Sequence, residues 1–133
     1  LEVGQNPTEF EHELFGETLR KCQRYLEIQK PSSSGGTCIF GTGYNESTSD
    51  SRGMIDFKEE KRAAPSVSVD AHTNFANVST GSTAALESIA FNGIQTFNCR
   101  YVAKSSNTTL VDGGAATLMN FANQGTITID AEL

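Results

Sequence analysis

The sequence predicts a mostly β protein: an antiparallel, jelly-roll-like β-sandwich with one short N-terminal α-helix. Three observations support this prediction. Ser, Thr, Asn and Gly make up 48 of the 133 residues, a composition that suits short strands and polar turns. Apolar and polar residues alternate along most of the chain after residue 30, as they do in half-buried strands. Turn-forming pairs such as Asn92-Gly93 separate these alternating stretches.

The chain length favours a single core, because single domains typically run to about 100–150 residues. We divide the chain into an N-terminal arm and helix, residues 1–30, and a β-sandwich, residues 31–133, within one compact domain. The Ser- and Gly-rich segment 32–36 joins the two parts.

A helix is predicted over Phe15–Ile28, ending before Lys30-Pro31. Four apolar residues at spacings of four, three and four line one face of this helix. They are Phe15, Leu19, Cys22 and Leu26. We expect this face to pack on the chain's own sheet; packing against neighbouring subunits is the alternative.

Eight strands are predicted after the linker, and no helical pattern lies between them to connect parallel strands. The strands are Thr37–Tyr44, Gly53–Lys61, Pro65–Asp70, Phe75–Thr80, Leu86–Asn92, Thr96–Lys104, Ala115–Phe121 and Thr126–Glu132. The clearest row of residues expected to face the core is Phe97, Cys99, Tyr101 and Ala103. Ile55 with Phe57, and Ile127 with Ile129, repeat this pattern.

Charge and composition exclude several classes of partner. The formal net charge of −6 argues against nucleic-acid binding, which depends on clustered Lys and Arg. No apolar stretch approaches the roughly 18 residues of a membrane-spanning helix, so we expect no membrane insertion. Cys22, Cys38 and Cys99 lack metal-site spacing, so we interpret them as free thiols and expect no metal or cofactor.

Catalytic motifs are absent from the sequence, and we expect no enzyme activity. We interpret Gly41-Thr42-Gly43 as a strand-end turn, because the third glycine of a dinucleotide-binding motif is missing. Asp70-Ala71-His72 is too short a pattern to predict a metal site. The charged run from Lys58 to Arg62 is interpreted as solvated surface.

Two polar segments are candidates for ligand binding. The first, Thr42–Arg52, combines an aromatic residue with short hydrogen-bonding groups. Its candidate residues are Tyr44, Asn45, Asp50 and Arg52. The second, Ser105–Gly114, contributes Asp112. The alternative is that both are ordinary solvated loops.

Short motifs at both ends and in the middle of the chain form a recognisable pattern. They are Leu1-Glu2-Val3-Gly4, Pro7-Thr8, Phe10-Glu11-His12, Leu19 followed by Cys22-Gln23-Arg24-Tyr25, Lys61-Arg62-Ala63-Ala64-Pro65-Ser66-Val67 and Asp130-Ala131-Glu132-Leu133. This pattern resembles the C-terminal domains of phage tail-fibre or capsid-fibre proteins. Between residues 70 and 125 the likeness extends to strand-and-turn character alone.

The resemblance implies a virion surface protein, with a β-sandwich at a fibre tip that binds a host receptor or surface glycan. It also implies contacts with other virion proteins and a homo-oligomer, often a trimer, whose interface we expect to include Ile94, Val102 and Met119. The alternative is a capsid-decoration or trimerisation module without receptor binding. In such proteins the Leu1-Glu2-Val3-Gly4 strand closes a preceding domain, so we expect Leu1 to lie mid-protein or after a cleavage.

Overall fold

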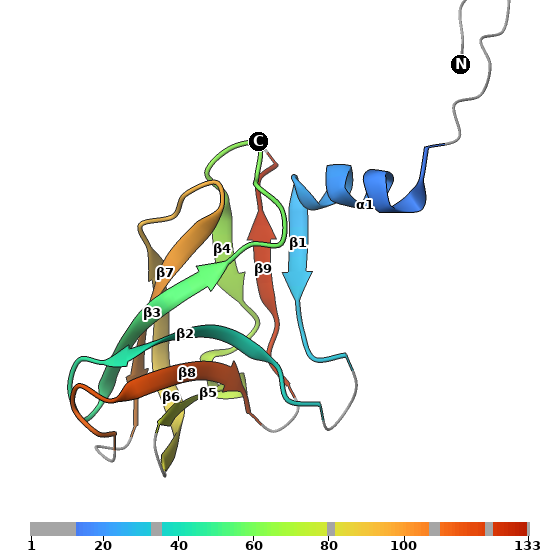
Figure 1. The fold of residues 1–133 in the computed structure, drawn as a ribbon. Coiled ribbons are helices and arrows are strands. Elements are labelled where there is room, and N and C mark those ends of the chain that lie inside the picture. Colours follow the sequence, from blue (N-terminus) through green and yellow to red (C-terminus); the bar gives the residue numbers. More distant parts are fainter. Residues whose placement is uncertain (1–12, 33–35, 80–81, 107–109, 122–123, 133) are drawn as a thin grey trace, which may run out of the picture.

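The computed structural model describes residues 13–32, 36–79, 82–106, 110–121 and 124–132. The elements are α1 (Phe15–Gln23), β1 (Leu26–Gln29), β2 (Ile39–Asn45), β3 (Asp50–Asp56), β4 (Ser66–Val69), the 3-10 helix η1 (His72–Asn74), β5 (Phe75–Ser79), β6 (Ser82–Asn92), β7 (Asn98–Ser105), β8 (Ala115–Asn120) and β9 (Ile127–Asp130) (Figure 1). The motifs at residues 1–4, 7–8 and 10–12 lie outside the described residues.

The mostly β fold with one short α-helix is confirmed. Strands account for 51% of the described residues, and every strand pairing among them is antiparallel. The structure differs from the predicted jelly-roll-like sandwich, because six strands form a closed barrel in the order β2-β3-β7-β6-β5-β8. Closure results from β2, which pairs with β3 along one edge and with β8 along the other.

The remaining strands form a small sheet in the order β1-β9-β4, and its apolar face packs on the barrel. Ile127 and Ile129 of this sheet belong to the same buried cluster as Phe40 and Phe75 of the barrel. The rings of Phe40 and Phe75 lie 5.2 Å apart between centroids. Because β1 belongs to this sheet, the N-terminal segment is bonded directly to the β domain.

The core rows predicted from alternation are largely confirmed. Cys99, Tyr101 and Ala103 are fully buried, but Phe97 lies just before β7 and is 57% exposed. Gly93, in the predicted Asn92-Gly93 turn, adopts a positive φ of 54°, and Gly113 at 71° and Gly125 at 116° do so too. The cysteines are free, and burial raises the pKa of the Cys99 thiol to about 11.

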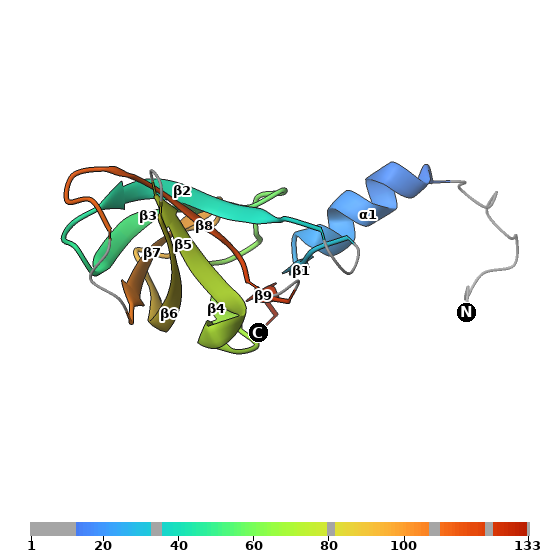
Figure 2. The ribbon, with the colours of Figure 1, turned by 90° about the horizontal axis from the view of Figure 1, so that it is seen from below.

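The predicted helix is too long, and its predicted packing is wrong. It ends at Gln23, because residues 26–29 instead bond to β9 as strand β1. No side chain of α1 is buried, and Phe15 is 81% exposed. Figures 1 and 2 show α1 extending away from the barrel. The apolar face therefore remains uncovered by the described part of the chain.

A buried ion pair connects the end of α1 and the start of β1 to the segment that follows β3 of the barrel. Lys61 Nζ lies 2.6 Å from Glu27 Oε2, and both side chains are at least 99% buried. The same ammonium donates a hydrogen bond to the Gln23 carbonyl oxygen at 2.6 Å. The backbone N–H of Lys58 donates to Glu27 Oε2 at 3.0 Å. The interpretation of Lys61 as solvated surface is therefore wrong.

Neighbouring contacts extend this connection. The backbone N–H of Arg62 donates to the Arg24 carbonyl oxygen at 3.1 Å. The Arg62 guanidinium lies over the Tyr25 ring, 5.2 Å from its centroid, a cation–π contact. The motif at residues 22–25 and the motif at residues 61–67 are thus in direct contact. We call this set of contacts the α1–barrel junction.

Candidate functional site

The outer face of the barrel carries a hollow of about 620 Å³ across β2, β3 and β7. We call it the outer hollow. Its lining residues are Thr42, Gly43, Tyr44, Arg52, Gly53, Met54, Asp56 and Arg100. Strand alternation directs the side chains of residues 42 and 44, and of residues 52, 54 and 56, to this face.

Two facing glycines form the floor of the outer hollow. Gly43 pairs with Gly53 across β2 and β3. A Cβ atom on Gly43 would collide with the backbone carbonyl oxygen of Arg52. A Cβ atom on Gly53 would lie 2.6 Å from the Tyr101 hydroxyl oxygen beneath the floor. The strand-end turn predicted for residues 41–43 is wrong, because these residues lie within β2.

Tyr101 supports this floor from inside the barrel. Its side chain is fully buried, and its hydroxyl has no hydrogen-bond partner in the described part of the chain. Burial raises the pKa of Tyr101 to about 12, because a phenolate is poorly solvated in the core. Tyr101 is therefore a neutral packing residue beneath the two glycines.

Tyr44 and Met54 supply exposed apolar surface at the outer hollow, each being 51% exposed. Tyr44 is directly opposite Arg52 on the neighbouring strand. Both residues belong to hydrogen-bonded strands, so their backbones are held by the barrel. The outer hollow thus combines an aromatic ring with a guanidinium on a rigid support.

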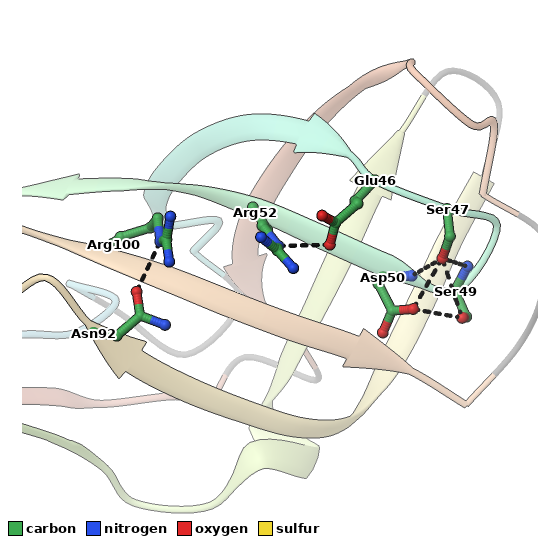
Figure 3. Close-up of polar contacts among 7 residues, drawn as sticks. All are labelled: Glu46, Ser47, Ser49, Asp50, Arg52, Asn92 and Arg100. Atoms are coloured by element: carbon green, nitrogen blue, oxygen red, sulfur yellow. Dashed lines mark hydrogen bonds and ion pairs between the residues drawn. The ribbon is translucent and has the colours of Figure 1, made fainter.

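Arg52 forms an ion pair at the rim of the outer hollow. Its Nε lies 2.5 Å from Glu46 Oε2 (Figure 3). The Nε–H has no acceptor in hydrogen-bonding geometry within the described residues, so the contact is a charge interaction without a well-directed hydrogen bond. Both side chains are more than a third exposed, and such pairs contribute little to stability.

Arg100 approaches the outer hollow from β7. Its Nε donates a hydrogen bond to Asn92 Oδ1 at 2.7 Å. Arg52 pairs with Val102 and Arg100 pairs with Met54, so the two arginines are diagonal neighbours on adjacent strands. Figure 3 shows them on the same face of the sheet. The barrel therefore places two guanidinium groups on one face of the sheet, with Arg52 directly opposite Tyr44 and Arg100 directly opposite Met54.

Buried polar residues hold the hairpin that carries Tyr44 and Arg52. Asn45 is fully buried, and its Nδ2 donates to Ser79 Oγ and to the Val111 carbonyl oxygen, both at 2.9 Å. Asn77 Nδ2 donates to Ser51 Oγ. Because Asn45 points into the barrel, the prediction that it contacts a ligand beside Tyr44 is not supported by its placement.

The other predicted ligand-binding residues lie outside the outer hollow. Asp50 ends the turn between β2 and β3, where its Oδ2 accepts hydrogen bonds from Ser47 Oγ at 2.9 Å and Ser49 Oγ at 3.1 Å. Asp112 is exposed in the turn before β8. Of the predicted set, Tyr44 and Arg52 line the outer hollow. Part of the Ser105–Gly114 segment, residues 107–109, lies outside the described residues.

The predicted interface residues Ile94, Val102 and Met119 are each half-buried, and Ile94 packs against the chain's own core. Sequence reasoning missed Met54, Asp56 and Arg100 as site residues. The alternation in β7 places Arg100 on the outer face, but its position beside Arg52 depends on the β3–β7 register.

Among the described residues, no group of three or more His, Cys, Asp or Glu side chains is arranged to hold a metal ion. No helix in the described ranges is long and apolar enough to cross a membrane. Comparisons with protein-family models, curated proteins and solved structures find no match to this chain.

Proposed function

We propose that this chain is a receptor-binding module of a phage virion fibre, displayed on the virion surface at a fibre tip, and that it binds a host-cell surface glycan. The observation that carries the proposal is the outer hollow, where Tyr44, directly opposite Arg52, and Arg100 from the next strand line one cavity over a glycine floor. The fibre motifs quoted above support the placement on a virion.

The chemistry of the outer hollow suits a sugar. The exposed face of Tyr44 offers a π surface to the C–H groups of a pyranose ring. Arg52 and Arg100 donate hydrogen bonds to sugar oxygens, and the Asp56 carboxylate accepts hydrogen bonds from hydroxyl groups. In this proposal the module binds the glycan without cleaving it.

Replacing Tyr44 with Ala is expected to weaken binding to host cells at least about 10-fold, because the sugar loses its aromatic platform. Saturation binding of the fluorescently labelled chain to a panel of bacterial strains measures this effect. Phe97→Ala is the matched control, since Phe97 is 57% exposed and does not line the outer hollow. Equal loss in both variants, or no saturable binding to any strain, contradicts the proposal.

The uncovered face of α1 favours a second function: a capsid-decoration or trimerisation module that contacts other virion proteins or further copies of itself. Leu14 and Phe15 are 72% and 81% exposed, and Leu19 is 43% exposed. A helix of nine residues is marginal in isolation. A neighbouring subunit would bury this face and stabilise the helix.

This second function predicts a trimer in solution that depends on α1. Light scattering at two micromolar concentrations is expected to give the mass of three chains for the unaltered protein and of one chain for Phe15→Ser/Leu19→Ser. Because α1 has no buried side chain, the double variant is expected to keep the barrel folded. A monomeric unaltered protein contradicts the trimer, and a trimeric double variant contradicts the role of α1.

A further inference from the structure

We infer that the glycan bound at the outer hollow is anionic, with its negative group held between Arg52 and Arg100. This inference rests on the proposed function and names the ligand class of the same site. The negative group is a carboxylate or a phosphate carried on a sugar, and both groups would bind the two arginines through negatively charged oxygens.

Arg100 lies at the outer hollow outside any ion pair of the described residues. Its contact is with the neutral amide of Asn92, and it forms no ion pair with another described residue. By contrast, Lys104 on the same strand lies 3.6 Å from Glu87. Within the described residues, the outer hollow of a chain of net charge −6 thus contains a guanidinium outside any ion pair, and Asp56 is its diagonal neighbour on β3.

Arg52 and Arg100 are diagonal neighbours on β3 and β7. Like charges on neighbouring strands repel each other, and here both project from the same face (Figure 3). Glu46 already offsets the charge of Arg52, and an anion between the two arginines would also offset the charge of Arg100. The planar guanidinium matches a carboxylate or phosphate with two parallel hydrogen bonds. Asn92 holds Arg100 by Nε, which leaves its terminal nitrogens for a ligand.

Arg52 already pairs with a carboxylate of the same chain. Glu46 is paired with it at 2.5 Å but is not aligned as a hydrogen-bond acceptor for Nε–H. Both groups are partly exposed, so exchange of Glu46 for a ligand anion costs little free energy. The Arg52 guanidinium thus already lies beside a carboxylate, one of the two groups inferred for the ligand.

Asp56 restricts the kind of anion that fits. It lines the same hollow, and its carboxylate repels a densely charged polymer while accepting hydrogen bonds from sugar hydroxyls. The outer hollow therefore favours a glycan with isolated negative groups over a nucleic acid. Tyr44, directly opposite Arg52, is placed to contact the sugar ring that carries or adjoins the negative group.

The test uses surface polysaccharide purified from a strain that the chain binds. One portion is treated with carbodiimide and borohydride, which converts carboxylic acids to alcohols, and another with hydrofluoric acid, which removes phosphate. We expect one treatment to weaken binding at least about 10-fold in calorimetry and so identify the source of the charge. Arg100→Gln is expected to weaken binding to the untreated polysaccharide by a similar factor and to leave binding to the neutralised one unchanged.

Lys104→Gln is the matched control, because it removes one positive charge from β7 outside the outer hollow. Retained affinity of both treated polysaccharides overturns the anionic ligand and leaves glycan binding intact. An equal loss in Arg100→Gln and Lys104→Gln shows a general charge effect and also overturns it. If no purified surface polysaccharide binds the unaltered chain, the proposed glycan-binding function fails together with this inference.

Discussion

Replacing Lys61 with Met is expected to lower the free energy of unfolding by about 3–5 kcal/mol, because it leaves a buried carboxylate without its counter-ion. Lys61 and Glu27 are both at least 99% buried, with 2.6 Å between Nζ and Oε2. The substitution also removes the hydrogen bond to the Gln23 carbonyl oxygen. Equilibrium urea denaturation of the purified chain measures the change.

Arg20→Met is the control for this prediction. Arg20 forms an ion pair with Glu59 at 3.3 Å, but its side chain is 73% exposed, and we expect a change below about 1 kcal/mol. The double variant Glu27→Met/Lys61→Met is expected to regain part of the lost stability, since no lone charge stays buried. A Lys61→Met variant as stable as Arg20→Met would show that the α1–barrel junction does not depend on this pair.

The same substitution tests what holds α1 in place. The buried ammonium ties the last carbonyl of α1, at Gln23, to the Glu27 side chain of β1. Without it, α1 keeps the Arg62 contacts with Arg24 and Tyr25. We therefore expect Lys61→Met to loosen the α1–barrel junction. Relative to the unaltered protein, the variant should show faster amide hydrogen exchange in β1, with a smaller change in β7.

The alternation of single residues was enough to predict most strands, but it was not enough to predict how they close. Ile127 and Ile129 are buried as expected, because burial on one face follows directly from a period of two. Barrel closure requires β2 to pair with β8, more than seventy residues away. Apolar and polar residues alternate along the strands of a sandwich and of a barrel alike. The pairing of β2 with β8 therefore leaves no local pattern in the sequence.

The candidate site also depends on strand pairings that the sequence pattern does not reveal. Tyr44 and Arg52 were predicted because they lie in one short polar segment, and the structure brings them together as a cross-strand pair. Arg100 joins them through the β3–β7 register. Lys61 was misread for a similar reason: its partner Glu27 is distant in the sequence, and a lysine among other charges is usually exposed.

Replacing Gly43 with Ala is expected to lower the free energy of unfolding by at least about 2 kcal/mol, because the barrel wall has no room for a methyl group there. The added Cβ would collide with the Arg52 carbonyl oxygen and lie 2.5 Å from the Gly53 Cα. Both are backbone atoms, so relief requires β2 and β3 to move apart. Thermal and urea unfolding measure this loss.

Gly16→Ala is the matched control, since no described atom outside its chain neighbours and the backbone of α1 lies within 4 Å of the added Cβ. Alanine favours a helix over glycine by about 1 kcal/mol, so this variant is expected to increase the helicity of α1 without destabilising the barrel. Similar destabilisation in both variants would contradict the argument from the close approach of β2 and β3.

Gly43→Ala also links the barrel wall to the outer hollow. Tyr44 and Arg52 are directly opposite each other, one residue beyond the glycine pair. Separation of β2 from β3 would therefore displace Tyr44 relative to Arg52. We therefore expect the folded Gly43→Ala protein to bind host cells at least about 10-fold more weakly, although no side chain of the hollow has been removed. Full binding by a destabilised Gly43→Ala variant would show that recognition does not depend on the spacing of these two strands.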